Sequence, residues 1–140
     1  MVKIYLDDTV SKKEKPPLED TDLMNFIAWF DHNYPHFAFL MIHVPNESDM
    51  PVQGRVKAKK KGVRSGVPDL LFLKSSGEYA GLAIEMKRAT KKHSSKVSDE
   101  QMMYLQELSE EDFFCVVAYG LEQAKIAEKE YLHCKYKAVY

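Results

Sequence analysis

Several features are missing from this sequence, and each absence excludes a class of protein. No apolar run approaches the ~20 residues that a membrane-spanning helix needs, and the N-terminus lacks the apolar core of a signal peptide. Only two cysteines are present, Cys115 and Cys134, and nothing around them is typical of a zinc site or a disulfide framework. We therefore expect a protein of the reducing cytoplasm that has no membrane partner.

Recognition modules are also absent. The sequence contains no helix-turn-helix, zinc finger, stacking aromatic platform, internal repeat or low-complexity segment. Its 140 residues suffice for one hydrophobic core but not for two domains. Residues 2 to 6 alternate and are compatible with an edge strand or a dimer contact, and residues 7 to 17 are polar and end in two prolines. We predict a strand and flexible linker over 1–17 and a single domain over 18–140.

Charge is nearly balanced, because the formal net charge is −1, which argues against a protein that coats nucleic acid indiscriminately. Two segments, 54–66 and 87–97, nevertheless carry only basic charges and hold 11 of the 20 lysines and arginines. A solvated loop is the usual explanation of one such segment, but two that flank an acidic site favour phosphate binding. The candidate contacts are Arg55, Lys57, Lys59, Lys60, Lys61, Arg64, Ser65, Arg88, Lys91, Lys92 and Lys96.

Three charged residues interrupt two short apolar segments, 66–73 and 81–88, which read as strands joined by a turn at 75–77. Asp69 stands at the start of the first, and Glu85 and Lys87 stand on one face of the second, because side chains alternate along a strand. Buried charges must be paired or bind a metal. Carboxylates, with the backbone carbonyl of Met86 available between Glu85 and Lys87, are ligands that suit Mg²⁺ or Mn²⁺.

A helix is predicted from about Leu18 to His32, because an apolar stripe repeats with helical spacing from Leu23 to Phe30. Glu19 falls within that stripe, whereas Asp20 and Asp22 fall well off it. Position alone leaves two explanations of Glu19 equally open: a functional acid, or an acid favoured in the first turn by the helix dipole.

The remaining elements complete an α-β-β-β-α-β-α order. Residues 37–44 read as a central strand that ends at His43, and Asn46 and Glu47 follow it as secondary candidates, although both are also turn formers. Ser98 and Gln101 fit a helix-capping box, with Gln101 on the face of Leu105 and Leu108. A buried strand over 113–119 and a helix over 121–133 follow, and 135–140 could add an edge strand. This order is that of a restriction-endonuclease-like α/β core, a mixed sheet flanked by helices.

Pro68-Asp69 followed by Glu85-x-Lys87 resembles the PD-(D/E)xK nuclease superfamily. Together with Gly66-Val67, Arg88, Ser98-x-x-Gln101, a helix that carries Glu19 and the 43–47 segment, it is similar to the virus-type replication-repair nuclease (VRR-Nuc) domain. The resemblance spans roughly residues 18 to 120.

The resemblance implies a function and a site. Asp69, Glu85, Met86 and Glu19 would hold Mg²⁺ or Mn²⁺, Lys87 and Gln101 would complete the catalytic set, and Ser98 and His43 remain secondary candidates. Small, phage-associated members act as dimers on branched DNA such as four-way junctions. We therefore expect a homodimeric endonuclease of the bacterial or phage-infected cytoplasm that acts on branched or duplex DNA and uses no small-molecule cofactor. Apolar residues at both ends could supply the dimer contact: Val2, Ile4, Tyr5, Tyr136, Val139 and Tyr140.

Two alternatives stay open from the sequence. One is a nucleic-acid-binding module that has the same fold but no activity, against which the complete Asp/Glu/Lys set argues. The other is a nuclease that acts on RNA.

Overall fold

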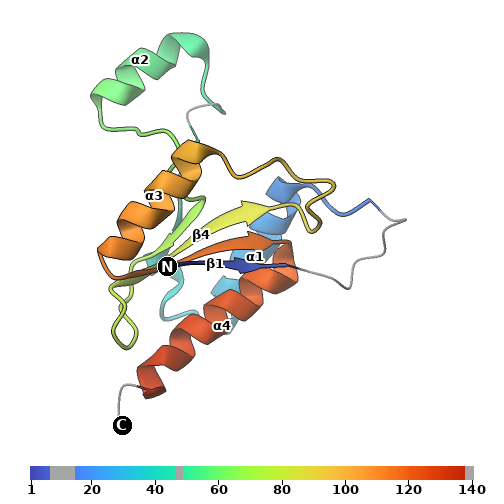
Figure 1. Cartoon of the computed structure of the whole chain (residues 1–140), viewed down its shortest axis with the longest axis vertical. Helices are drawn as coiled ribbons and strands as arrows, with labels where there is room; N and C mark the ends of the chain where they lie inside the picture. Colours follow the sequence, from blue (N-terminus) through green and yellow to red (C-terminus); the bar gives the residue numbers. More distant parts are fainter. Residues whose placement is uncertain (7–14, 47–48, 138–140) are drawn as a thin grey trace.

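The structure is a computed structural model that describes residues 1–6, 15–46 and 49–137, with side chains up to His133. Helices and strands follow one another as expected for an α/β chain (Figure 1). In chain order the elements are β1 (Val2–Tyr5), α1 (Glu19–Asn33), a 3₁₀ turn (Ala38–Leu40), β2 (Met41–His43), α2 (Val52–Lys60), β3 (Leu70–Phe72), β4 (Gly81–Lys87), α3 (Asp99–Glu110), β5 (Phe113–Tyr119) and α4 (Leu121–Lys137).

Five strands form one mixed sheet in the order β1-β5-β4-β3-β2. The strand β5 runs parallel to both of its neighbours, β1 and β4, whereas β3 is antiparallel to both β4 and β2. The predicted mixed sheet flanked by helices is therefore confirmed. The predicted edge strand at the N-terminus is also present, since β1 pairs with β5 from Val2 to Tyr5.

Alternation along β4 divides its side chains between two cores. Leu82, Ile84 and Met86 belong to the larger core, which is closed by Phe26, Phe30 and Tyr131 of α1 and α4 together with other apolar residues. Ala83 belongs to the smaller core, beneath Leu105 of α3. Glu85 and Lys87 continue the face of Ala83, so the fold directs both toward α3.

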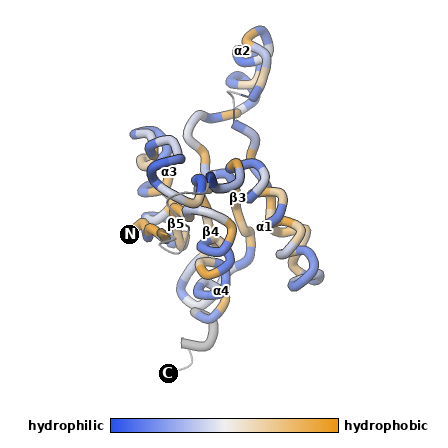
Figure 2. The backbone as a smooth tube through the Cα atoms, turned by 90° about the vertical axis from the view of Figure 1, so that its right-hand side faces the viewer, coloured by the Kyte–Doolittle hydropathy of each residue, from blue (hydrophilic) through white to orange (hydrophobic). Residues whose placement is uncertain are grey.

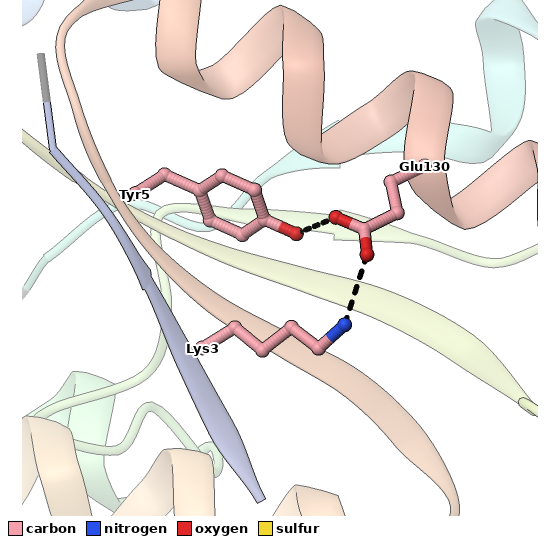
Figure 3. A network of polar contacts seen from close by, with 3 residues as sticks. All are labelled: Lys3, Tyr5 and Glu130. Carbon is pink, nitrogen blue, oxygen red and sulfur yellow. Dashed lines mark hydrogen bonds and ion pairs between the residues drawn. The ribbon is translucent and has the colours of Figure 1, made fainter.

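The strand β1 is fastened to α4 as well as to β5. Lys3 Nζ lies 2.9 Å from Glu130 Oε1, and the hydroxyl of Tyr5 donates to the other carboxylate oxygen (Figure 3). Val2 and Tyr5 also pack against the two cores. Two of the residues expected at a dimer contact are therefore used within the chain, while Ile4 is 53% exposed.

Two expectations about strands were wrong. Residues 37–44 do not form a central strand: they open with the 3₁₀ turn, and only Met41–His43 pair, as β2 at the sheet edge. Apolar side chains there partly face solvent, with Phe39 77% exposed. Residues 135–137 continue α4 rather than start an edge strand, and 138–140 lie outside the described residues, as does most of the predicted linker.

The helix α2 stands away from the sheet, beyond α3, in both views (Figures 1 and 2). None of its residues is buried, and it carries basic residues in its last turn. The basic segment 54–66 thus consists of most of α2 and the chain that returns from it, and together they form a projecting arm. No helix in the described part of the chain is long and apolar enough to cross a membrane.

Candidate active site

Asp69 is fixed at the point where β3 begins. Its Oδ2 accepts a hydrogen bond of 2.7 Å from the backbone amide of Met86 in β4. The backbone pairing of β3 with β4 begins at the next residue, Leu70. Its carbonyl oxygen accepts from the amide of Val44 at 2.9 Å and contacts His43 Nδ1 at 2.8 Å. Asp69 is therefore held from both sides, by β4 and by the end of β2.

Glu85 and Lys87 are almost fully buried, at 2% exposure each, and both reach Gln101 at the start of α3. Gln101 Nε2 donates to Glu85 Oε1 at 2.9 Å, and Lys87 Nζ donates to Gln101 Oε1 at 3.3 Å. Lys87 also donates to Ser95 Oγ at 3.1 Å. Four polar groups from one strand, one loop and one helix thus form a connected network beneath α3.

The predicted capping box places Gln101 in this network. Ser98 Oγ accepts from the amide of Gln101 at 3.1 Å, and Gln101 Oε1 accepts from the amide of Ser98 at 2.9 Å. The side-chain amide of Gln101 therefore caps the helix, as the sequence predicted, and also contacts Glu85 and Lys87.

Gly66 brings the segment before Asp69 close to this helix end. It has φ +78°, and a Cβ there would lie 2.7 Å from the carbonyl carbon of Glu100. A side chain is excluded both by the backbone conformation and by this approach.

Burial raises the pKa of all three carboxyl groups at the site, and repulsion between carboxylates adds to the rise for Glu85 and Glu19. Burial, followed by the charge of Asp69, raises the pKa of Glu85 to about 9, and Lys87 opposes the rise. Burial also raises the pKa of Asp69, although its hydrogen bond from Met86 opposes this. Burial and Asp69 raise the pKa of Glu19 to about 7, with Lys87 again opposing. Glu19, the first residue of α1, is therefore close to the Asp69–Glu85 pair.

Arg88 fastens the start of α1 in this position. Its guanidinium donates to the carbonyl of Pro16 at 2.8 Å through Nη2 and to that of Pro17 at 3.1 Å through Nε. It also lowers the pKa of Asp22, which burial raises and whose Oδ2 has no hydrogen-bond partner in the described residues. Asp22 is 4% exposed, so placing it off the buried face was wrong.

The residues present fit a hard divalent cation. Glu85 Oε2 is buried and has no hydrogen-bond partner among the residues the structure describes, which leaves an oxygen available to an ion. Asp69, Glu85 and the Met86 carbonyl are oxygen donors, as Mg²⁺ or Mn²⁺ prefer. Within the described ranges no three His, Cys, Asp or Glu side chains meet closely enough to hold an ion alone. The set would therefore need the Met86 carbonyl, or oxygens of water or phosphate.

Comparison with known proteins agrees with this geometry. The family model of the VRR-NUC domain matches residues 27–122, a range that contains Asp69, Glu85, Lys87 and Gln101. The chain belongs to the VRR-NUC domain family. Membership implies a nuclease of the PD-(D/E)xK superfamily.

A solved structure described as a VRR_NUC domain protein has the same fold, with a TM-score of 0.74. It is 24% identical in sequence, and the match covers 86% of this chain and 93% of that one. A search of curated proteins found no match.

Most of the basic residues predicted to contact nucleic acid in this VRR-NUC chain lie on two exposed segments, and one of them, Arg88, instead makes contacts within the chain. Arg55, Lys57, Lys59 and Lys60 lie on α2, and Lys61, Arg64 and Ser65 lie on the chain that returns from it. Lys91, Lys92 and Lys96 are exposed on the loop before α3. Arg88 differs from these, because its guanidinium binds backbone carbonyls.

Of the three secondary candidates from residues 43–47, His43 contacts a residue of the site. His43 touches the carbonyl of Asp69 and is exposed, Asn46 is exposed beyond β2, and Glu47 lies outside the described residues.

Three residues near the VRR-NUC site were not singled out from the sequence. Ser95 contacts Lys87, Asp49 raises the pKa of Glu19, and Asp22 is buried near Arg88. Ser95 and Asp49 stand in polar segments without a local pattern, so no sequence signal marks them. Asp22 could have been found, because it lies one helical turn after Glu19.

Proposed function

We propose that this protein is a Mg²⁺- or Mn²⁺-dependent, structure-selective DNA endonuclease that hydrolyses phosphodiester bonds of branched DNA such as four-way junctions. The observation that carries the proposal is the buried Glu85, which is joined to the buried Lys87 through Gln101 and lies close to the half-buried Asp69. Burying the Glu85 carboxyl and the Lys87 ammonium beside a second carboxylate is costly unless the site has a use for them.

The chain's own groups divide the chemistry. Asp69, Glu85 and the Met86 carbonyl would coordinate the ion, and Glu19 would provide a further carboxylate ligand. A divalent cation bound there supplies Lewis acidity, a more acidic water and charge neutralisation at the phosphate. Lys87, oriented by Gln101 and Ser95, places its ammonium beside the carboxylates, where it can position a water or a phosphate oxygen.

Substrate binding would come from phosphate contacts. The exposed lysines of α2 and of the loop before α3 present positive charge on two sides of the acidic site. Contacts of this kind set position and affinity but carry no sequence information, so we expect selection by DNA shape.

The direct test is a panel of labelled substrates: continuous duplex, flap, four-way junction and single-stranded RNA, each with Mg²⁺, Mn²⁺ or EDTA. We expect metal-dependent cleavage with a preference for branched DNA. Cleavage of RNA alone would transfer the assignment to RNA, and no cleavage of any substrate would leave a binding module.

We also propose that the active form is a homodimer in the bacterial or phage-infected cytoplasm, because resolving a two-fold symmetric junction requires two cuts. The edge strand β1 with its exposed Ile4, beside a hollow lined by Met1, Val2, Met102 and Gln106, is the candidate contact. Light scattering at micromolar concentration tests this: we expect twice the 16.2 kDa chain mass, and a monomer would refute it.

A further inference from the structure

A pocket lies beside the active site, between α3 and the chain that returns from α2. Its volume is about 300 Å³, and it is lined by Ser65, Glu100, Met103, Tyr104 and Glu107. The four residues from α3 follow the i, i+3, i+4, i+7 spacing of one helix face. None of them takes part in the network of Glu85, Lys87 and Gln101.

The pocket and the active site share their supports. Tyr104 follows Gln101 by one helical turn, and Gln101 contacts Glu85 and Lys87. On the other wall, Ser65 precedes Gly66, whose backbone packs against that of Glu100, and Asp69 follows three residues later. A strand of DNA bound at Asp69 and Glu85 would therefore run next to this pocket.

The residues that line the pocket indicate which part of a nucleotide, the base or the phosphate, could bind in it. The lining surface is mostly apolar, with the ring of Tyr104 and the thioether of Met103, which is 62% exposed. Glu100 and Glu107 add negative charge, which repels a phosphate but can accept a hydrogen bond from the amino group of a base. The occupant that fits is a neutral, planar nucleobase.

The size and the surroundings agree with a single base. A volume of 300 Å³ is at the lower end of the ~300–1,000 Å³ of small-ligand sites. Lys61 and Arg64 are exposed on the same returning chain, next to Ser65, where they can contact the phosphates on either side of an inserted base.

We propose that this pocket receives one unpaired nucleobase of the substrate strand, adjacent to the scissile phosphate, and that the base stacks on Tyr104. The inference rests on the proposed function and adds a physical basis for structure selectivity. A base in continuous duplex must first be extruded from the stack, whereas an unpaired base at a junction, flap or gap enters without that cost.

Binding to two duplexes of the same sequence tests the pocket, one continuous and one with a single unpaired nucleotide, both in EDTA so that no cleavage occurs. Wild-type protein should bind the interrupted duplex more tightly by about 5- to 150-fold, the range expected for one aromatic stack. Tyr104→Ala should bind both duplexes equally, and Tyr104→Phe should keep the preference. The matched control is Phe39→Ala, which removes an exposed aromatic ring that belongs neither to the pocket nor to the active site and should leave the preference unchanged.

A second readout uses the wild-type protein and so does not depend on how well a variant folds. With 5-iodouracil at the unpaired position, irradiation should attach the DNA to Tyr104, as identified by mass spectrometry. A preference that survives Tyr104→Ala, or attachment at a residue outside the pocket, would overturn the inference. DNA cleavage in Mg²⁺ without any preference for the unpaired nucleotide overturns the pocket alone, whereas failure to bind or cleave any DNA overturns the proposed function with it.

Discussion

Gln101 donates a hydrogen bond of 2.9 Å from Nε2 to Oε1 of Glu85. The oxygen of the same side-chain amide caps α3 and accepts from Lys87. The start of α3 and the two charged residues of β4 are therefore placed by one side chain. Because Glu85 Oε2 has no hydrogen-bond partner in the part of the chain that the structure describes, the network balances only one of its two carboxylate oxygens.

Glu85→Gln should stabilise the metal-free protein while it abolishes cleavage. The raised pKa of Glu85, about 9, lies above pH 8. Folding at pH 8 therefore costs free energy, because the carboxyl must either take up a proton or stay charged beside Asp69. An amide removes that cost. We expect the free energy of unfolding to rise by at least about 1 kcal/mol, since one pKa unit corresponds to about 1.4 kcal/mol.

Urea denaturation in EDTA at pH 8 measures the effect. Glu110→Gln, at an exposed position of α3, is the matched control and should change little. A destabilised Glu85→Gln protein would mean that the ionised carboxylate is well compensated in the fold.

Arg88→Ala should destabilise the protein through the start of α1 rather than through DNA binding. The change removes hydrogen bonds to Pro16 and Pro17 and leaves Asp22 buried without its nearby cation. We expect the free energy of unfolding to fall by about 2–3 kcal/mol, typical of charged hydrogen bonds. Cleavage should also fall, because the start of α1 would no longer hold Glu19 close to Asp69.

A double-mutant cycle separates this from phosphate binding. Adding Asp22→Asn to Arg88→Ala should restore part of the stability. Unchanged stability with weaker DNA binding would instead make Arg88 a contact to the substrate.

Glu128 should make stability fall as pH rises. This residue of α4 is fully buried, and burial raises its pKa to about 7 from an ordinary value of 4.5, although the nearby Tyr34 opposes the rise. The folded state therefore holds a proton that the unfolded state has released, so the contribution of Glu128 to the free energy of unfolding declines between about pH 4.5 and pH 7 and then levels.

Glu128→Gln should flatten this decline and make the protein more stable than wild type at pH 8, by up to about 3 kcal/mol. Glu122→Gln, an exposed position on the same helix that pairs with Lys125, is the control and should leave the profile unchanged. Parallel profiles for wild type and Glu128→Gln would contradict the assignment.

Removing Lys59, Lys60 and Lys61 together should weaken DNA binding alike for all sequences. The logarithmic salt dependence of binding should become shallower by about 0.9 for each phosphate that the variant no longer neutralises. The control removes the same number of charges at Lys74, Lys125 and Lys129, which lie over the rings of Phe37 and Trp29. An identical salt slope in the two variants would show that the arm does not bind phosphates.

The sequence predicted the central sheet well where burial is complete. The strand expected over 113–119 is β5 with the same bounds, because a run that is apolar on both faces has no alternative to the interior. The 37–44 segment looks equally apolar but only Met41–His43 pair, since a short apolar run does not reveal how many of its neighbours will be exposed.

The site was predictable to the extent that it depends on short-range spacing. Glu85 and Lys87 share a face because they are two residues apart, and Ser98 and Gln101 form the expected box. The contacts of Arg88 with Pro16 and Pro17 could not be predicted, because they join segments more than seventy residues apart. Nor does any local sequence pattern distinguish an arginine that donates to backbone carbonyls from one that binds the phosphates of a substrate.

Cleavage of a labelled four-way junction in Mg²⁺ by wild type and by Asp69→Ala, Glu85→Ala and Lys87→Ala tests the central claim most directly. We expect the two carboxylate variants to give no product above background, because each removes a ligand. Glu85→Ala also empties a buried position, so Glu85→Gln, which keeps the volume, should be equally inactive. Lys87→Ala should reduce turnover by at least about 100-fold, as expected for a group that positions a reacting water, while it still binds Mn²⁺. Near-normal cleavage by any one of the three would contradict the assignment of that residue, and near-normal cleavage by all would place the active site elsewhere.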